Sequence, residues 1–458
     1  MSHHYASINP FTEELVKSFT LHTDEQVEAA LTQAHAVYQS DWSRGPIETR
    51  LAVLARLADL LEQRVDVFAT AMATEMGKPL AQGQGEVKLC IGIARYYAEQ
   101  AKTMLAPVPY PIARGEAVVE HFPVGVLVAV EPWNFPLYQL IRVVAPAIAV
   151  GNPVLLKHAE NVPQCAELFE TLVRDAGAPA GVLVNLFITK EQVAALIGDD
   201  RIQGVALTGS ERAGSAVAAR ASEMLKKSTL ELGGSDVFVV LDDADVAKAA
   251  KVGAGARLSN AGQVCTAAKR FILHAKVADA FLAAFTGHMQ AATMGDPMDP
   301  ATTLGPLSSK GARDNLERQV SDAVAHGATV VIGGKPAPRQ GFFYEPTILT
   351  GVTPANPMFY EEFFGPVAQV FVAADDDAIV AIANDSRFGL GGSMFTGDIA
   401  RGKAMAARIE TGMVFINSSS TSQPQLPFGG VKRSGYGREL GDLGIMEFVN
   451  KKLMVVAG

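Results

Sequence analysis

The spacing of apolar residues divides the chain into a helical first part and later parts rich in strands. Over residues 24–100, apolar side chains recur at helical spacing, as in the run ETRLAVLARLADLLEQRVDVFATAMATEMG. Such spacing puts these side chains on one face of a helix, and Gly77 with Pro79 just beyond it is typical of a helix end. Alternating and β-branched residues then predict a strand-rich excursion over residues 108–123.

Residues 125–232 alternate short apolar runs with helical stretches. The order is GVLVAV, PLYQLIRVVAPAIAVG, NPVLLKH, VPQCAELFETLVRDAG, GVLVNLF, a further helix, GVALTGS and RAGSAVAARASEMLKKS. This alternation is typical of an α/β fold with a parallel sheet covered on both faces. The runs FILH, ATVVIGG, VAQVFVA, GGSMFT and GMVFINS predict a second α/β domain over residues 233–435. The tail KKLMVVAG predicts a terminal strand, and a short exposed edge strand is a usual place for subunit pairing.

Composition and charge narrow the class of protein. The chain has 458 residues, a length that favours two to four domains at about 100 to 200 residues each. It carries 39 Lys and Arg against 48 Asp and Glu, a net charge of −9, and no basic run. Nucleic acid and anionic membranes are therefore poor candidates for partners.

The cysteines and the chain ends indicate a cytoplasmic protein. The three cysteines, Cys90, Cys165 and Cys265, form no CxxC pair, and no histidines cluster at the spacing of metal ligands. We expect neither a disulfide framework nor a metal site, and a reducing compartment. The first residues lack the pattern of a signal peptide, and the most apolar stretch, residues 143–156, is interrupted by Pro and Gly, so we expect no membrane span.

Cys265 is the candidate nucleophile among the cysteines. It lies in NAGQVCTAAKR, among small and polar residues, with Lys269 and Arg270 following. We expect a loop-to-helix junction here, where the helix dipole would lower the pKa of the thiol. The alternative is a buried structural cysteine, which suits Cys90 and Cys165 better because both lie on amphipathic helices.

Two further residues are candidates for catalysis. Glu231 ends a strand in STLELGGSD, and a partly buried carboxylate there would have the raised pKa that a general base needs. Alternatively, Glu231 faces solvent or pairs with Lys226 or Lys227. Asn134 in EPWNFP could donate to a developing oxyanion, or it could be a turn residue between two prolines.

The sequence also contains candidates for a dinucleotide site, although no GxGxxG follows a strand. In GVALTGSERAG, Gly209 and Ser210 lie between a strand and a helix, where backbone amides could contact a pyrophosphate. Lys157 and Glu160 end another strand, and both could bind ribose hydroxyls. The alternative is that these two residues are solvated surface charges.

A set of motifs, taken together, resembles the aldehyde dehydrogenase superfamily. These are EPWNFP, LLKHAE, LTGSERAG, LELGGSD, GQVC, EEFFGPV and PFGGVKRSGYGRELG, in this order over most of the chain. The resemblance implies that Cys265 is the nucleophile, Glu231 the general base, and Asn134 with the backbone N–H of Cys265 the oxyanion hole. It also implies a dinucleotide site with Glu362 on the ribose next to the nicotinamide. The implied lining residues are Pro132, Trp133, Lys157, Glu160, Gly209, Ser210, Gly234, Glu362 and Phe364.

The resemblance further implies a fold and a mechanism. A Rossmann-like cofactor domain would comprise residues 1–107 and 124–232, an α/β catalytic domain residues 233–435, and a bridging arm of a homodimer or homotetramer residues 108–123 and 436–458. The thiolate would attack the aldehyde carbon, hydride would pass to the nicotinamide, and a water activated by the general base would hydrolyse the thioester.

The continuation EPWNFPLYQLIR resembles the succinate-semialdehyde dehydrogenase subgroup. This resemblance implies that Arg142 and Ser422 hold the distal carboxylate of the substrate, a sensible pair for an anion. Alternatively, Arg142 only pairs with an acid on a helix surface, and the substrate is glutarate semialdehyde or a medium-chain aldehyde. Two alternatives belong to other classes of protein. A Cys-dependent hydrolase would need a His partner for the cysteine in a recognisable motif. A catalytically silent binding protein would be expected to have lost Cys265, Glu231 or Asn134.

The choice of cofactor depends on Glu160. Its charge should repel a 2′-phosphate, which favours NAD. Lys157 and His158 could supply a cation that offsets this repulsion, so NADP is also a candidate cofactor.

Overall fold

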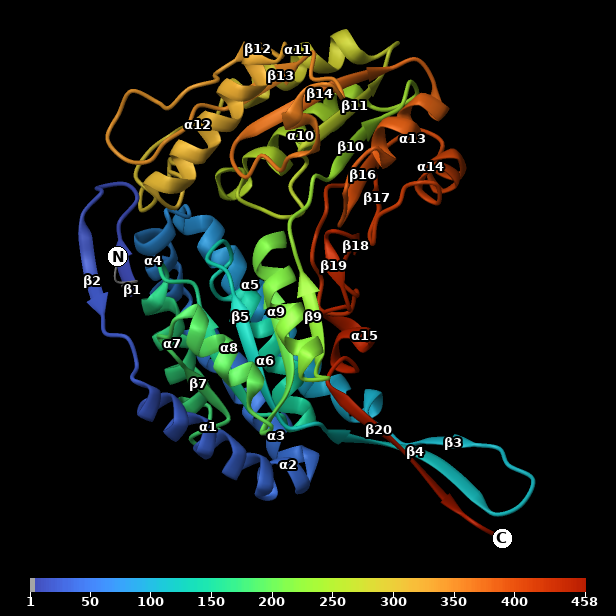
Figure 1. Ribbon diagram of the computed structural model, residues 1–458. Helices are drawn as coiled ribbons and strands as arrows, with labels where there is room; N and C mark the ends of the chain where they lie inside the picture. The colour runs from blue at the N-terminus through green and yellow to red at the C-terminus, as the bar shows by residue number, and fades with distance from the viewer. Residues whose placement is uncertain (1–4) are drawn as a thin grey trace.

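The structure is a computed structural model that describes residues 5–458. Residues 1–4 lie outside the described residues. The predictions for them, that they are part of the first domain and not of a signal peptide, concern residues that the structure does not describe. Two large sheets with their helices form two layered bodies, and a narrow arm extends from one of them (Figure 1).

The first sheet has six strands in the order β19-β9-β8-β5-β6-β7. All neighbours are parallel except β19, which is antiparallel to β9. The strands are β5 (Val126–Glu131), β6 (Val154–His158), β7 (Leu183–Asn185), β8 (Ile202–Thr208), β9 (Lys227–Glu231) and β19 (Gly435–Tyr436). The predicted parallel sheet is thus confirmed.

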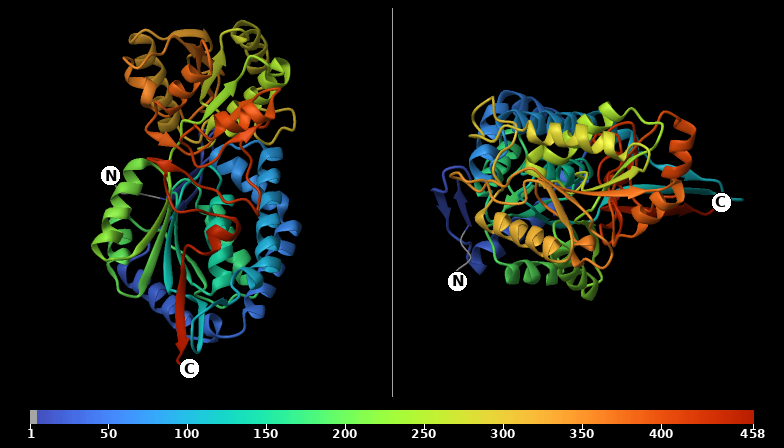
Figure 2. Two further views of the ribbon diagram at one scale, coloured as in Figure 1. Left: turned by 90° about the vertical axis from the view of Figure 1, so that its right-hand side faces the viewer. Right: turned by 90° about the horizontal axis from the view of Figure 1, so that it is seen from above.

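Helices cover both faces of this sheet because its strands are apolar on both sides (Figure 2). One face of the sheet, which carries the side chains of Val128 and Val205, packs against α1 (Asp24–Gln39), α8 (Lys190–Gly198) and α9 (Glu211–Glu223). On the face of Leu127 and Ala206 pack α6 (Tyr138–Val150) and α7 (Pro163–Asp175), backed by α3 (Ile47–Gln63), α4 (Val65–Met76) and α5 (Leu80–Met104).

The helical region departs from its prediction at one point. The long apolar run after Pro46 forms α3 and α4 rather than one helix, because Arg64 leaves helical geometry with φ −117° and ψ 20°. The predicted stop at Gly77 is confirmed, since this residue has φ 77° and its N–H donates to Ala73 O at 3.1 Å.

The second sheet has seven strands in the order β12-β13-β14-β11-β10-β16-β17, parallel except for β12. Its strands are β10 (Val237–Val240), β11 (Arg270–His274), β12 (Thr329–Ile332), β13 (Thr347–Thr350), β14 (Val367–Ala373), β16 (Gly392–Phe395) and β17 (Phe415–Ile416). One face packs against α10 (Val246–Leu258) and α11 (Ala278–Gln290). The other packs against α12 (Lys310–Ala325), α13 (Asp376–Asn384) and α14 (Ile399–Ala406).

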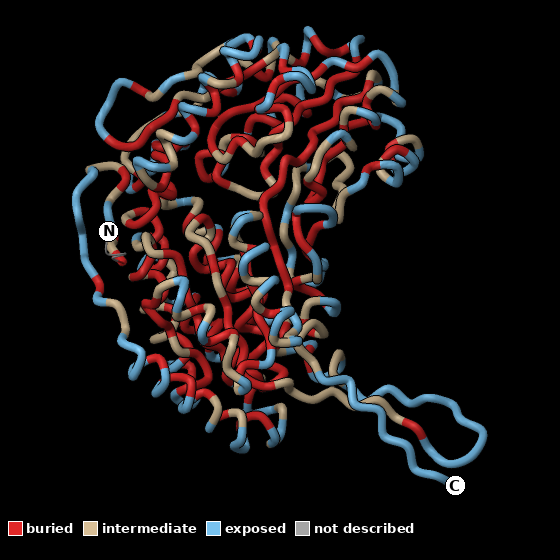
Figure 3. Tube along the Cα trace, viewed as in Figure 1, coloured by how far each residue is buried: buried red, intermediate tan, exposed pale blue. Residues whose placement is uncertain are grey.

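The strand-rich excursion and the tail meet in one antiparallel sheet. Its order is β20-β4-β3, formed by β3 (Val108–Tyr110), β4 (Glu116–Pro123) and β20 (Val449–Val456). The sheet extends from the body of the molecule and is largely exposed (Figures 1 and 3). The predicted strands are therefore confirmed, and they pair with one another across the length of the chain.

Short elements complete the fold. They are β1 (Tyr5–Ile8), β2 (Leu15–Phe19), α2 (Asp41–Arg44), η1 (Ser259–Gly262), η2 (Pro357–Tyr360), β15 (Phe388–Gly389), β18 (Val431–Lys432) and α15 (Gly441–Ile445). Among the helices of residues 5–458, none combines the length and the apolar character needed to cross a membrane.

Candidate active site

Three polar residues end neighbouring strands of the first sheet in one row. Thr208 in β8 lies opposite Glu231 in β9, and Glu131 follows Val130, which lies opposite Leu207. All three polar side chains are buried. Residues in one row point to the same face, and the carboxyl ends of parallel strands are where ligands gather in α/β sheets.

Cys265 lies in a turn between η1 and β11, so the predicted loop-to-helix junction is wrong. The chain reaches this turn through left-handed residues, including Gly262 with φ 75°, where a Cβ would lie 2.2 Å from Gly365 O. Lys269 then fixes the turn, because its Nζ donates to Cys265 O at 2.6 Å. Positive charge near the thiol therefore comes from side chains and not from a helix end.

The Cys265 side chain lines a cavity of about 470 Å³ between the two bodies. This cysteine is partly exposed, whereas Cys90 and Cys165 are fully buried. The other walls come from both bodies, including α6, α10, β16 and the segment before β18. The lining residues include Phe135, Tyr138, Gln139, Asp236, Val252, Ser259, Ser393, Ser419, Ser422 and Phe428. The cavity suits a small organic substrate with a few polar groups.

Asn134 is buried and held close to the Cys265 turn. One N–H of its side chain donates to Gln263 O at 3.1 Å, which leaves the second N–H for another acceptor. Its backbone O accepts from Lys78 Nζ at 2.9 Å and from Asn260 Nδ2 at 2.8 Å. Asn134 is therefore a fixed donor and not merely a turn residue.

The loop that carries Asn134 is held by a buried ion pair which sequence reasoning missed. Lys78 pairs with Glu86, and both side chains are 1% exposed. Glu86 Oε1 also accepts from the backbone N–H groups of Leu137 and Tyr138, each at 2.9 Å. The start of α6 is thereby fixed by a residue of α5.

Glu231 is 3% exposed, and neither carboxylate oxygen has a hydrogen-bond partner within residues 5–458. The predicted alternative pairing with lysine is wrong. Lys226 donates to backbone carbonyl groups, and Lys227 pairs with Glu447 at 2.6 Å. Burial raises the pKa of Glu231 well above its usual range, the nearby Glu439 adds to the rise, and Arg142 opposes it.

The pKa of the Cys265 thiol is also raised, to about 12, chiefly by burial. The positive charges of Arg142 and Lys269 oppose this rise, and the Glu231 carboxylate adds to it. The thiol is therefore protonated at neutral pH in this state, and a base must take its proton before it can attack. Glu231, whose pKa is itself raised, suits that role.

Glu131 is a second orphaned carboxylate that sequence reasoning missed. It is 3% exposed, both of its oxygens lack a partner within the described chain, and burial, reinforced by Glu439, raises its pKa well above the usual range. It directly precedes PWNFP at a strand end. The argument that singled out Glu231, an acid at the end of an apolar strand, would have found it.

The structure does not place Arg142 on the wall of the Cys265 cavity. Its side chain is fully buried, and Nε lies 2.6 Å from Glu439 Oε2. The guanidinium lies over the rings of Tyr138 and Phe428, 4.6 Å from each centroid, and both residues line the cavity. This favours the alternative that Arg142 pairs with an acid, although the acid is buried and not on a helix surface.

Ser422, by contrast, lines the cavity directly, and Tyr138 donates to its hydroxyl at 2.7 Å.

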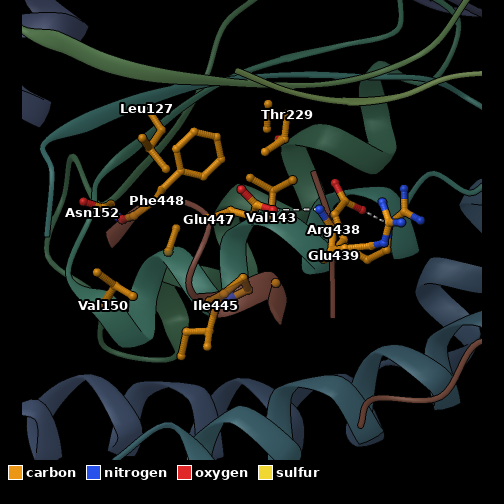
Figure 4. A pocket seen from close by; sticks show the side chains of 15 residues that line it. Leu127, Val143, Val150, Asn152, Thr229, Arg438, Glu439, Ile445, Glu447 and Phe448 are labelled. Carbon is orange, nitrogen blue, oxygen red and sulfur yellow. Dashed lines mark hydrogen bonds and ion pairs between the residues drawn. The ribbon is translucent and has the colours of Figure 1, made fainter. Parts of the chain in front are cut away.

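A much smaller cavity, of about 20 Å³, lies on the other side of Arg142 and Glu439. Figure 4 shows Glu439, Arg438 and Glu447 around it, together with Thr229 of β9 and apolar side chains. Glu447 Oε1 accepts from the backbone N–H of Arg438 at 2.8 Å. The volume suits about one water molecule, so this cavity is not a substrate site.

The residues expected to bind the dinucleotide form two groups. Lys157 lies near the end of β6 and forms an ion pair of 2.5 Å with Glu160, which follows the strand. Ser210 caps α9 by accepting from Ala213 N at 3.3 Å. Gly209 donates to Glu231 O at 2.9 Å. These residues lie at the carboxyl edge of the first sheet, as predicted for a ligand site.

The second group lies next to the Cys265 turn. Glu362 Oε1 accepts from Gly234 N at 3.1 Å and lies 2.9 Å from Lys269 Nζ. Trp133, which follows Pro132 after β5, contacts Phe364 edge to face at 5.8 Å. A Cβ on Gly234 would lie 2.7 Å from Cys265 O, so only glycine fits there.

Among residues 5–458, no three His, Cys, Asp or Glu side chains gather in a group that could hold a metal ion.

Comparison with known proteins places these features in a wider context. The family model described as "aldehyde dehydrogenase family" matches residues 1–454. A protein of Deinococcus radiodurans named succinate-semialdehyde dehydrogenase (NADP(+)) is 47% identical over 98% of this chain and 94% of its own length. One of Mycobacterium tuberculosis, named succinate-semialdehyde dehydrogenase (NADP(+)) 1, is 45% identical over 99% of both chains.

The chain is also similar to solved structures of enzymes with these names. The succinic semialdehyde dehydrogenase of Streptococcus pyogenes in complex with NADP+ has a TM-score of 0.98 and 47% identity, over 99% of this chain and 100% of that one. The succinate-semialdehyde dehydrogenase of Burkholderia pseudomallei has a TM-score of 0.96 and 35% identity, over 99% of this chain and 95% of that one.

Proposed function

The chain belongs to the aldehyde dehydrogenase family, and on that premise we propose that it oxidises succinate semialdehyde to succinate with a nicotinamide dinucleotide. The observation that carries the proposal is the position of Cys265, a partly exposed thiol on the wall of a cavity large enough for a small aldehyde. The names of the similar enzymes from D. radiodurans and S. pyogenes support the choice of substrate.

In the proposed mechanism, Glu231 accepts the thiol proton and the Cys265 sulfur attacks the aldehyde carbon. The oxyanion accepts hydrogen bonds from the free N–H of the Asn134 amide and from the backbone N–H of Cys265. A bound nicotinamide would supply the hydride acceptor, so that the aldehyde carbon is oxidised by two electrons and a thioester remains on Cys265. Glu231 releases the thiol proton to solvent and then takes a proton from a water molecule, which attacks the thioester; the C–S bond breaks, and succinate and the Cys265 thiolate are released.

The distal carboxylate of the substrate has polar partners in the cavity. We place it against the hydroxyl groups of Ser422 and Tyr138, which already form a hydrogen bond with each other. The Arg142 guanidinium, behind the Tyr138 and Phe428 rings, would contribute its positive charge without contact. A neutral aldehyde gains nothing from this arrangement, which is the basis of the proposed preference.

The dinucleotide is proposed to bind along the carboxyl edge of the first sheet, between Ser210 and the Lys157–Glu160 pair, and to extend to Glu362, Trp133 and Phe364. We propose that both NAD and NADP are accepted. The names of the relatives support NADP, whereas the Glu160 carboxylate opposes a 2′-phosphate unless Lys157 turns from it to the phosphate.

The test of substrate choice is the appearance of reduced cofactor with succinate semialdehyde, glutarate semialdehyde and butanal. We expect kcat/KM for succinate semialdehyde to exceed that for butanal about tenfold or more, which corresponds to ~1.4 kcal/mol of transition-state preference. The Cys265→Ala variant should show no turnover. Equal efficiency with butanal would leave the family assignment intact and refute the proposed substrate.

The cofactor proposal is tested by Glu160→Gln. Removing the negative charge should raise the ratio of kcat/KM with NADP to kcat/KM with NAD about tenfold, because Lys157 is then free to pair with the 2′-phosphate. Glu167→Gln, an exposed acid whose Oε2 pairs with Lys17, is the matched control. An unchanged ratio in Glu160→Gln would show that this carboxylate does not govern the choice.

A further inference from the structure

A second large cavity, of about 810 Å³, lies at the root of the arm. Its walls come from α2, α3, α5, β4 and β20, and it shares no residue with the cavity that contains Cys265. The ionisable side chains that line it are Arg44, Arg50, Lys102, His121 and Lys452, and no described Asp or Glu is among the lining residues. Such a concentration of cations is unexpected in a chain with a net charge of −9.

Arg50 is the buried centre of this group, with 6% exposure. Its Nε donates to Ala149 O at 3.1 Å, and its Nη1 donates to Trp42 O at 2.7 Å and Gly45 O at 3.2 Å. These bonds fix the guanidinium plane, and Nη2 has no acceptor within residues 5–458. An oriented guanidinium edge with free N–H groups suits an oxyanion.

Carboxylates compensate only part of this positive charge, chiefly through Glu48, which lies near both Lys102 and Arg50. Lys102 pairs with Glu48 at 2.6 Å. Within the described residues, Arg44, Arg50 and Lys452 form no ion pair, and Glu120, which lies opposite Lys452 in the β4–β20 register, does not pair with it. Positive side chains that converge from four elements repel one another. An anion in the cavity would lower this electrostatic repulsion.

We propose that this cavity binds a small phosphate-bearing anion with two or more negative charges. Its polar wall supplies the cations, and the side chains of Tyr38, Ile47 and Pro107 supply an apolar wall for an organic part. Inorganic pyrophosphate and a nucleoside diphosphate share this chemistry. Because the lining joins β4 and β20 to α2 and α3, the bound anion would fix the arm to the first body of the molecule.

The test is calorimetric titration of the full-length protein with pyrophosphate and, separately, with ADP, at constant ionic strength. NADP is left out because its own phosphate groups would compete for this cavity, and binding at the proposed dinucleotide site is recognised as the part that the probe variant leaves unchanged. The probe variant is Arg44→Ala with Lys452→Ala, both exposed and remote from Cys265. The matched control is Lys451→Ala, the neighbouring exposed lysine of β20, which is not among the residues that line the cavity.

We expect saturable binding that weakens about tenfold in the double variant and is unchanged in Lys451→Ala. Binding of ADP alone would identify a nucleotide as the ligand, and binding of pyrophosphate would show that the phosphate groups suffice. Absence of saturable binding by either probe, or equal weakening in both variants, would overturn the proposal. Dehydrogenase turnover, which does not depend on this cavity, should be unchanged in both variants and separates this result from a failure of the proposed function.

Discussion

The Arg142–Glu439 ion pair is almost wholly removed from water, with side-chain exposures of 0% and 8%. Loss of one partner leaves the other as an uncompensated buried charge, so Arg142→Met should lower the free energy of unfolding by about 3 to 5 kcal/mol. Combining it with Glu439→Gln should recover most of that loss, because the orphaned carboxylate is gone. Urea unfolding of the wild type, both single variants and the double variant measures this coupling.

If the two substitutions instead lowered the free energy of unfolding additively, the ion pair would not be what retains Arg142. That result would favour the role predicted from the sequence, in which Arg142 holds the distal carboxylate of the substrate.

Ser422 gives a residue-level test of substrate recognition that leaves the buried ion pair intact. Ser422→Ala removes a hydroxyl from the cavity wall and leaves Tyr138 OH without its acceptor. We expect KM for succinate semialdehyde to rise about tenfold, the value of a hydrogen bond to a charged group, with kcat little changed. Steady-state kinetics with butanal is the internal control, and an equal rise of KM for butanal would contradict the assignment.

At the scale of single residues, motifs predicted the site residues that stand in short distinctive runs of sequence. They did not predict the residues whose position depends on contacts between distant parts of the chain. Cys265, Glu231 and Asn134 each stand in a distinctive run. Cys265 lines the cavity and Asn134 donates to Gln263 O near it, while the catalytic roles of all three stay predictions. Glu439 also stands in such a run, but its partner Arg142 lies on another element, and no spacing rule connects the two. Whether an arginine faces a substrate or a buried acid depends on tertiary packing.

The arm carries several exposed apolar side chains on its edge strand. Within β20, Leu453, Val455 and Val456 are 59%, 58% and 65% exposed in the single chain. Apolar strands of this kind at a sheet edge favour pairing with another copy of the chain. Val455→Asp should therefore shift the protein to a smaller species in sedimentation velocity, whereas Lys451→Gln on the same strand should not. A wild type that sediments as a monomer would refute the expected homo-oligomer.

The sequence predicted whether a segment is a helix or a strand better than it predicted where each element begins and ends. The βα alternation predicted the first sheet because hydrophobic periodicity reflects burial, which the packed fold then enforces. The break at Arg64 was missed because the apolar spacing continues across it. The turn at Cys265 was mistaken for a helix start because its small residues have no periodicity. The left-handed backbone before it passes close to the distant Gly365, and no local pattern shows that approach.

Asp236 bears on the pH dependence of the whole molecule, because it lies where the chain passes from the first sheet to the second. Its Oδ1 accepts from Gly391 N at 3.0 Å, and Oδ2 has no partner within the described chain. Burial raises the pKa of this carboxyl from 3.8 to about 7, although Lys269 opposes the rise. The folded state therefore holds a proton that the unfolded state releases over this range.

The sign of the effect follows from linkage. Between pH 4 and 7 the folded protein binds more protons at Asp236 than the unfolded chain, so this residue makes stability fall as pH rises. Asp236→Asn cannot ionise, and its gain in unfolding free energy over the wild type should be larger at pH 8 than at pH 4.5. Urea unfolding at both pH values measures the difference, with the exposed Asp200→Asn as control. A gain that is equal at both pH values would mean that Asp236 is ionised throughout, with Lys269 compensating fully for its burial.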